Sequence, residues 1–446
     1  MKAAFHTLGC KVNQYETQAM TEQFERAGFE IVGEDEAADC YIINTCTVTN
    51  LADRKSRQFI RKARRMCPGA VIAVTGCYSQ VCPEDLWAMP EVDIVTGNGD
   101  KPHLIELVTE AMEERKRIYS VMSYDELTEY RDRGIIMSME GRTRAYIKIQ
   151  EGCNRFCSYC LIPFARGKVR SRDPEEILRE AEALIRGGFR EIVLTGINTA
   201  LYGTEDDFEK KFPGAEKGIE YIIRRMDAIE GDFRIRLSSL EPTVVNADYV
   251  AGLLKYRKLC PHLHLSIQSG SDSIIRAMNR HYTGEDYLDI VRVLREHDPG
   301  YGITTDIIVG FPGETEEDFR DSLKMTEEAE FLKVHVFKYS PRKGTRAEKM
   351  KDQVSGTEKN SRSDRLEEAE QISRRRFFEK EKGRIRTVLP EEITEDGLLT
   401  GFTENYIRVY TEPPEGLPED KYMNEFLKVV IGDPYEDGVK GKLMTE

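Results

Sequence analysis

Long apolar runs and a dense cysteine pattern are both absent from this sequence of 446 residues. No run approaches the roughly 18 apolar residues that a membrane span needs. The start, Met1-Lys2-Ala3-Ala4-Phe5-His6, runs directly into a short strand pattern instead of the apolar core of a signal peptide. Ten cysteines are too sparse for a disulfide scaffold. We therefore expect a cytoplasmic protein without a membrane partner, whose cysteines serve metal or redox chemistry.

An excess of positive charge is absent as well. The chain has 65 Lys and Arg residues against 79 Asp and Glu residues, so its net charge is -14. This sign excludes a protein that coats nucleic acid over its whole surface, although a local basic stripe can still bind RNA. Hydrophobic residues make up 40% and charged residues 32%, which is typical of packed domains. The length predicts about three hydrophobic cores.

The most specific motif is a Cys-x3-Cys-x2-Cys loop formed by Cys153, Cys157 and Cys160, directly after a strand-like stretch. Three thiolates this close can hold three corners of an iron-sulfur cluster and leave one iron open. The alternative is a zinc knuckle or three unrelated thiols, but a structural zinc site needs four ligands and no fourth Cys or His lies near. The spacing, with Tyr159 before the last cysteine, resembles the radical S-adenosylmethionine (SAM) superfamily. In that family SAM binds the open iron and yields a deoxyadenosyl radical.

Residues 145 to 340 alternate short apolar runs with amphipathic helical stretches, which predicts a partial parallel barrel of about six strand-helix units. The runs are 147–150, 191–195, 234–238, 263–268, 304–309 and 333–338. Active sites of parallel barrels gather at the C-terminal ends of the strands. A glycine or polar residue there is by itself often only part of a turn. With the radical SAM resemblance, the candidates for binding SAM are Tyr159, Gly196, Asn198, Ser238, Glu241, Gln268, Ser269 and Gly310.

The first 117 residues have a different rhythm. Strand-like runs at 3–8, 41–45, 71–75 and 92–96 alternate with helical stretches, which predicts a doubly wound parallel sheet. Three of these strands end in a cysteine: Cys10, Cys46 and Cys77. Because ligands in such sheets bind at the carboxyl ends of the strands, we predict a second three-thiolate cluster there. Cysteine is also a common buried residue, and that interpretation suits the predicted non-ligands Cys40, Cys67, Cys82 and Cys260.

Segments 8–16, 44–49, 75–78 and 153–160 together resemble the methylthiotransferases over essentially the whole chain. The first segment, Leu-Gly-Cys-Lys-Val-Asn-Gln-Tyr-Glu, is most similar to the MtaB group. The resemblance implies an enzyme that inserts a methylthio group at C2 of N6-threonylcarbamoyladenosine, next to the anticodon of tRNA. It also implies two [4Fe-4S] clusters, SAM as both methyl donor and radical source, an external electron donor and a sulfur source. No side chain alone is expected to be catalytic, because the clusters and SAM carry the chemistry.

Three alternatives to this function stay open. Two lie within the family: the MiaB group, which modifies isopentenyladenosine, and the RimO group, which modifies a ribosomal-protein aspartate. The third belongs to another class, a two-cluster electron carrier or scaffold. Such a carrier would not need six barrel units with polar strand ends, and it would not bind SAM.

Two basic stretches are the candidate RNA contacts, and we expect both to flank the barrel mouth. Residues 342–386 hold 15 Lys and Arg residues against 9 acidic residues, a local charge of +6. Within this stretch, Arg374, Arg375 and Arg376 are predicted on a helix that could follow a phosphate backbone. Arg54, Lys55 and Arg57 lie on the predicted helix after Cys46. A solvated helix face is an equally good interpretation of the longer run.

After residue 383, five short strands with Gly and Pro turns predict a small barrel of the oligonucleotide-binding type, which resembles the TRAM domain of the family. The predicted fold class is therefore α/β with a doubly wound parallel sheet, a partial (β/α)6 radical SAM barrel and a small all-β barrel. The predicted ranges are 1–117 for the N-terminal methylthiotransferase domain, 118–140 for a linker, 141–375 for the radical SAM core and 376–446 for the TRAM domain. The charged loop 204–218 has no mechanistic account in this scheme.

Overall fold

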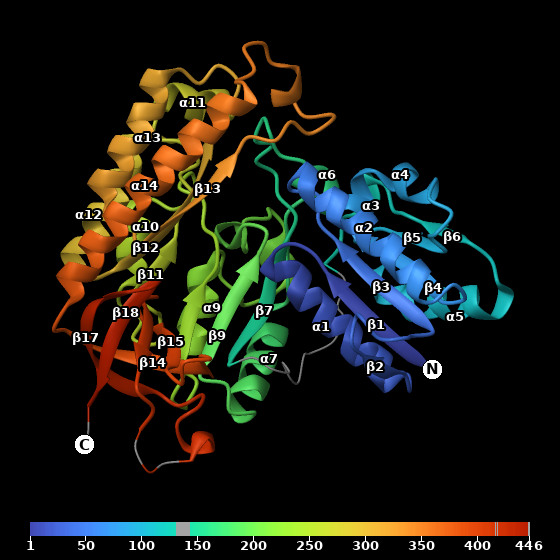
Figure 1. Ribbon diagram of the computed structural model, residues 1–446, viewed down its shortest axis with the longest axis horizontal. Helices are drawn as coiled ribbons and strands as arrows, with labels where there is room; N and C mark the ends of the chain where they lie inside the picture. Colours follow the sequence, from blue (N-terminus) through green and yellow to red (C-terminus); the bar gives the residue numbers. More distant parts are fainter. Residues whose placement is uncertain (131–142, 415, 417, 445–446) are drawn as a thin grey trace.

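The computed structural model describes residues 1–130, 143–414, 416 and 418–444. Figure 1 shows an N-terminal sheet with its helices, a central partial barrel and a small C-terminal barrel. Among the described residues, no helix combines the length and the apolar character needed to cross a membrane.

The N-terminal sheet has six parallel strands in the order β2-β1-β3-β4-β5-β6. Alternate residues of its strands face two cores: Ala3 and Ile42 pack with α1 and α5, while Ala4 and Ile43 pack with α2. This arrangement confirms the predicted doubly wound sheet. The elements are β1 Lys2–Thr7, α1 Lys11–Arg26, β2 Glu30–Val32, β3 Cys40–Thr45, α2 Asn50–Met66, β4 Val71–Gly76, α3 Cys77–Val81, α4 Pro83–Trp87, β5 Ile94–Thr96, η1 Lys101–His103, α5 Leu104–Glu114, β6 Ile118–Ser120 and η2 Tyr124–Glu126.

The strand order of this sheet reverses at β1, because β2 and β3 pair with its opposite edges. Such a switch point is where open parallel sheets bind ligands. The two outer strands, β2 and β6, were not expected from the sequence, since each has only three residues and neither is deeply buried. Strand β6 lies in the range interpreted as a linker, and residues 131–140 of that range lie outside the described residues.

The central region consists of two sheets, β10-β9-β7-β8 and β11-β12-β13. Isolated parallel bridges at Ile235–Leu259, Leu240–Leu265 and Gln268–Ile307 connect neighbouring strands, so the six parallel strands follow one another around the predicted partial barrel. The antiparallel edge strand β8 was not predicted. The strands are β7 Arg144–Glu151, β8 Arg170–Ser171, β9 Glu191–Gly196, β10 Arg234–Leu237, β11 His262–His264, β12 Gly302–Val309 and β13 Lys333–Lys338.

The helices of this region are α6 Ile162–Arg166, α7 Pro174–Arg186, η3 Thr199–Leu201, α8 Phe208–Lys211, α9 Ile219–Asp227, α10 Ala247–Leu253, α11 Asp272–Ala277, α12 Gly284–His297, α13 Glu316–Ala329, η4 Ala347–Lys349 and α14 Gly356–Glu381. Helix α14 runs along β13 and α13 and also contacts β17 of the small barrel. Phe377 and Phe378 at its end belong to the core of that barrel. The helix thus crosses the predicted boundary at residue 375.

The small barrel is closed in the order β14-β15-β16-β18-β17, which agrees with the predicted all-β domain. Its strands are β14 Ile385–Ile393, β15 Leu399–Thr403, β16 Arg408–Thr411, β17 Leu427–Tyr435 and β18 Gly438–Leu443, with η5 Glu419–Lys421 before β17. Buried arginines of β10 attach it to the central barrel. Arg234 donates to the Thr387 carbonyl at 3.1 Å and Arg236 to the Glu404 carbonyl at 3.2 Å.

The charged loop 204–218 is anchored to the central barrel. Phe208 in α8 is fully buried and packs edge-on against Tyr202, with ring centroids 5.6 Å apart. The Glu205 carboxylate accepts hydrogen bonds from the backbone and the hydroxyl of Ser171 at 2.5 and 2.8 Å. The buried Phe208 ring and the hydrogen-bonded Glu205 carboxylate therefore hold this polar segment against the barrel.

Candidate active site

Cys153, Cys157 and Cys160 lie in the loop between β7 and α6. Gly152 opens this loop with a φ of +75°, and a Cβ there would lie 1.8 Å from the Lys168 carbonyl oxygen, so glycine is required. The Cys153 amide donates to the Gly167 carbonyl at 3.1 Å, which folds the loop back on itself. Burial raises the pKa of Cys153 to about 11 and also raises the pKa of Cys160. The neighbouring Cys157 raises the pKa of both thiols further.

These three cysteines line a cavity of about 320 Å³ at the C-terminal ends of the barrel strands, which we call the cluster cavity. Val48 and Thr49, from the loop after Cys46, form part of its wall. Among the predicted SAM-binding residues, the cavity is lined by Tyr159, Asn198, Glu241 and Gln268. Gln268 adopts a φ of +69°, which is uncommon for a residue with a side chain and typical of functional sites.

Glu241 is the polar centre of the cluster cavity. Its carboxylate accepts a hydrogen bond from the Asn198 amide at 3.0 Å and forms ion pairs with Arg155 at 3.0 Å and Arg280 at 3.5 Å. Arg155 and Arg280 were missed in the sequence analysis. Arg155 lies inside the cysteine loop, and this position could have predicted it as a site residue. Nothing in the sequence around Arg280 points to the site.

The other four predicted SAM-binding residues lie elsewhere. Gly196 and Ser238 line an adjoining cavity of about 330 Å³, which we call the inner cavity. Ser269 is fully buried, and its hydroxyl accepts from the Ser271 amide at 3.2 Å. Gly310 has a φ of +72°, and its backbone N–H donates to the Glu314 carboxylate at 2.6 Å, so it forms part of a turn. Ser269 and Gly310 line neither cavity, so their predicted contact with SAM has no support from their position.

Cys10, Cys46 and Cys77 follow the adjacent strands β1, β3 and β4. The register pairs Thr7 with Asn44 and Thr45 with Gly76, which brings the three strand ends together at the switch point. Burial raises the pKa of Cys46 to about 12, and Cys77 raises it further. Cys10 is accessible to solvent although protein surrounds it, because it lines the inner cavity.

A buried ion network connects the two cysteine triads. Arg166, fully buried in α6, donates to the Cys77 sulfur at 3.2 Å and pairs with Glu16 of α1 at 2.5 Å. It also pairs with Glu151 at the end of β7 at 3.0 Å. Lys148 contacts Glu16 and Glu151 at 2.7 and 2.8 Å. Burial opposes ionisation of Glu151, but Lys148, Arg170 and Arg166 lower its pKa below the ordinary value. No role was predicted for Arg166 from the sequence.

The donor set of each triad fits an iron-sulfur cluster better than a single zinc ion. Within the part of the chain that the structure describes, one group of three candidate ligands converges within 4.8 Å, and it is His264, Asp306 and His335. The three sulfurs of each triad are therefore spread more widely than three thiolates on one tetrahedral zinc ion with bonds of about 2.3 Å. Burial raises the pKa of Cys46, Cys153 and Cys160, and a bound metal favours the thiolate form that ligation requires.

The cluster cavity likewise fits SAM. The Asn198 Oδ1 acceptor, the Arg280 Nε donor and the Tyr339 hydroxyl are buried on its wall without a hydrogen-bond partner among the described residues. A ligand with an amino group, a carboxylate and ribose hydroxyls would satisfy them, and buried polar groups rarely stay unpaired.

The two predicted basic stretches lie in different places. Arg54 and Lys55 are exposed near the start of α2, which follows Val48 and Thr49 of the cluster cavity wall. Arg57 donates to the Tyr78 hydroxyl at 2.6 Å. The expectation that both stretches flank the mouth is wrong for Arg374, Arg375 and Arg376. Helix α14 runs antiparallel to β13, so Arg376 pairs with Glu327 at 2.9 Å, near the start of β13, while the cavity lies at its end.

Comparisons with known proteins agree with this geometry. The family described as the radical SAM superfamily matches residues 147–326, and uncharacterized protein family UPF0004 matches residues 2–97. The chain is 41% identical to the threonylcarbamoyladenosine tRNA methylthiotransferase MtaB of Bacillus subtilis (strain 168), over 98% of this chain and 95% of that protein. It is 36% identical to the tRNA-2-methylthio-N(6)-dimethylallyladenosine synthase of Clostridium tetani (strain Massachusetts / E88), over 86% and 84% of the two chains.

A solved structure shows the same fold at low sequence identity. The radical SAM methyltransferase TsrM of Kitasatospora setae, with cobalamin and a [4Fe-4S] cluster bound, matches with a TM-score of 0.55 and 18% identity. The match covers 76% of this chain and 73% of that chain.

Replacing one triad at a time should remove half of the iron. We expect Cys153→Ala, Cys157→Ala and Cys160→Ala together to abolish cleavage of SAM to 5'-deoxyadenosine, because no open iron then faces the cluster cavity. The same changes at Cys10, Cys46 and Cys77 should spare SAM cleavage. Iron analysis after anaerobic reconstitution measures the first effect. The matched control carries Ser at Cys40, Cys67, Cys82 and Cys260, and a loss of iron from that variant would contradict the assignment.

Arg166→Met should lower both stability and the reduction potential of the cluster held by Cys77. Loss of this buried cation leaves Glu16 and Glu151 less compensated, at a cost of about 3–5 kcal/mol. Loss of a hydrogen bond to a ligand sulfur lowers the potential of an iron-sulfur cluster. Arg172→Met is the matched control, since Arg172 is equally buried but pairs with Glu180 and Tyr15. Denaturant unfolding and redox titration followed by EPR would show similar stability losses, with the potential changed only in Arg166→Met.

Proposed function

We propose that this chain, which belongs to the MtaB family of radical SAM tRNA methylthiotransferases, methylthiolates C2 of N6-threonylcarbamoyladenosine next to the anticodon of tRNA. The observation that best supports this proposal is that Cys153, Cys157 and Cys160 line one cavity and Cys10 of the second triad lines the adjoining one. The cluster cavity and the inner cavity share Ser239, Asp306 and Phe337. A base held between them would reach both triads.

The residues of the chain divide the work. When bound, two [4Fe-4S] clusters and SAM would supply the radical and the methylated sulfur, which no side chain can provide. Cys153, Cys157 and Cys160 would hold the radical-generating cluster, and Cys10, Cys46 and Cys77 the sulfur-carrying one. Three thiolates per cluster leave one iron open in each. Tyr159, Asn198, Glu241 and Gln268, which line the cluster cavity, would orient SAM.

The mouth of the cluster cavity has features suited to an RNA loop. Arg54 and Lys55 are exposed, and no hydrogen bond or ion pair is found for either among the described residues. Phe156 and Phe164 are 41% and 47% exposed, with ring centroids 6.0 Å apart. Exposed aromatic rings beside basic side chains can stack unpaired bases of a loop. A base in an anticodon loop must leave its stack before its C2 reaches the site. The proposal also implies a cytosolic setting, an external electron donor and a sulfur source.

The second candidate within the family is an enzyme for isopentenyladenosine tRNA. Its support is the 36% identity to the Clostridium tetani synthase, against 41% to the Bacillus subtilis MtaB protein.

Purified, reconstituted enzyme should methylthiolate tRNA that carries threonylcarbamoyladenosine. The assay gives the protein SAM, a reductant and sulfide, and detects the 2-methylthio nucleoside by mass spectrometry. The comparison substrates are the same tRNA with unmodified adenosine, isopentenyladenosine tRNA and ribosomal protein. Activity confined to either of the last two would overturn the substrate assignment but leave the two-cluster chemistry standing.

Charge reversal at the mouth should weaken tRNA binding more than reversal on α14. We expect Arg54→Glu with Lys55→Glu to lower affinity at least tenfold and to reduce the salt dependence, because each lost phosphate contact lowers the slope by about one. Arg374→Glu, Arg375→Glu and Arg376→Glu together are the matched control on the far end of the barrel. Fluorescence anisotropy against salt concentration measures both, with SAM cleavage as a folding check. Equal losses in the two variants would place the RNA elsewhere.

A further inference from the structure

The inner cavity is built from all three parts of the fold. Its walls come from Lys11 in the N-terminal domain, from the inner faces of the barrel strands and from Tyr406 in the small barrel. Cys10, a member of the second triad, also lines it. Its volume of about 330 Å³ lies at the lower end of the roughly 300–1,000 Å³ of small-molecule sites. The cavity is therefore large enough for a substituent of a base but not for a whole nucleotide with SAM.

Lys11 lines this cavity, and Tyr406 and Glu191 favour its positive charge without contacting it directly. No hydrogen bond or ion pair is found for it among the described residues, although protein surrounds most of its side chain. The cations nearest to it are both neutralised, since Arg144 pairs with Glu391 and Arg236 with Glu191, each at 2.6 Å. The buried Lys101 and Lys148 both pair with Glu16. An ammonium withdrawn from water without a counter-ion is costly, so an anionic ligand is the missing partner.

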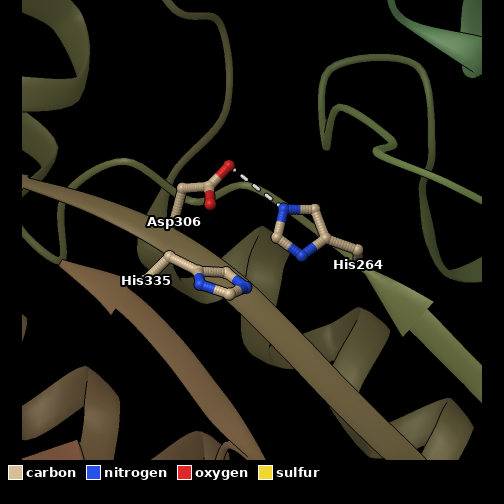
Figure 2. A group of neighbouring side chains, drawn as sticks. All are labelled: His264, Asp306 and His335. Carbon is tan, nitrogen blue, oxygen red and sulfur yellow. Dashed lines mark hydrogen bonds and ion pairs between the residues drawn. The ribbon is translucent and has the colours of Figure 1, made fainter. Parts of the chain in front are cut away.

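The barrel wall facing Lys11 carries polar groups that are free to bind. The His264 ring forms a hydrogen bond of 3.0 Å with the Asp306 carboxylate. Figure 2 shows this pair with His335 beside it. Ser266 also donates to Asp306 at 2.7 Å, so this carboxylate is satisfied within the fold. No hydrogen bond is found for His335 in the described ranges. The Ser238 hydroxyl and His262 Nδ1 are buried on the same wall and have no hydrogen-bond partner within the described part of the chain.

We propose that the inner cavity binds the threonylcarbamoyl group of the substrate, with Lys11 on its carboxylate and with His335 and Ser238 on its hydroxyl and urea atoms. This assignment rests on the proposed function. The group combines one negative charge with several hydrogen-bonding atoms in a short chain, which matches the wall. It is attached at N6, and only N1 separates C6 from C2 in the adenine ring. A base with C2 toward the triads would therefore place its substituent in a cavity that Cys10 lines.

The same wall explains selectivity within the family. An isopentenyl substituent has no charge and no hydrogen-bonding atom, so it would leave Lys11, His335 and Ser238 unsatisfied. Sites built to hydrogen-bond a substrate reject analogues that lack the bonding group, because buried polar groups then stay unpaired.

The test compares two forms of one RNA, an anticodon stem-loop with threonylcarbamoyladenosine and the same stem-loop with the threonine carboxylate converted to a carboxamide. Wild-type enzyme should prefer the acid over the amide by about tenfold to a hundredfold in kcat/KM, as expected for a hydrogen bond to a charged group. Anisotropy binding without SAM should show the same preference. In Lys11→Met the ratio should fall to about one, with iron content and SAM cleavage retained.

Two further variants distinguish loss of substrate binding from a folding defect. His335→Ala, distant in sequence from both triads, should lower kcat/KM on the acid form several-fold and leave SAM cleavage unchanged. Lys333→Met is the matched control, because Lys333 is on the same strand but pairs with Glu370 at 3.5 Å. An undiminished acid preference in Lys11→Met would overturn the proposal, as would stoichiometric zinc on His264, Asp306 and His335. A wild-type enzyme inactive on both stem-loops and on whole tRNA would instead overturn the proposed function.

Discussion

The ion pairs of Arg166 with Glu16 and Glu151 determine how the two halves of the active site face each other. Glu16 belongs to the helix that follows Cys10, Glu151 to the strand that precedes Cys153, and Arg166 also contacts the sulfur of Cys77. Each partner is buried, so the network is held together by the high cost of leaving any one charge unpaired. The same charges that join the N-terminal sheet to the barrel therefore also fix the separation and orientation of the two cysteine triads.

Around this junction the barrel is closed only partly, and its open side is completed by other parts of the chain. The loop after Cys46 covers the cluster cavity, while Lys11 and Tyr406 complete the inner cavity. The small barrel is bound to the central barrel by Arg234 and Arg236, whose charges Glu191 neutralises. It therefore contributes a wall to the site besides any role in holding RNA. The net charge of the chain is -14, so any RNA contact depends on local basic groups such as the exposed Arg54 and Lys55.

The cavities also separate two tasks by their chemistry. The cluster cavity has a carboxylate at its centre, Glu241, whose charge is shared between Arg155 and Arg280. That arrangement suits a zwitterionic cofactor. In the inner cavity, Lys11 has no ion pair with any described residue, and that arrangement suits an anionic substituent.

The sequence by itself determined most of the elements and predicted which six cysteines the fold groups into two triads, because these follow from local patterns. Alternation of apolar runs with amphipathic helices predicted the parallel strands, and cysteines at three strand ends predicted a common site, since carboxyl ends of parallel strands meet at one edge. Short edge strands such as β2, β6 and β8 have too few buried residues to leave a pattern. Only the tertiary structure decided which distant side chains meet. Arg166 and Arg280 are ordinary arginines in the sequence, and their partners lie up to 153 residues away. The direction of α14, which places Arg374 away from the mouth, depends on how the helix packs against β13. The pattern of residues within the helix does not predict that direction.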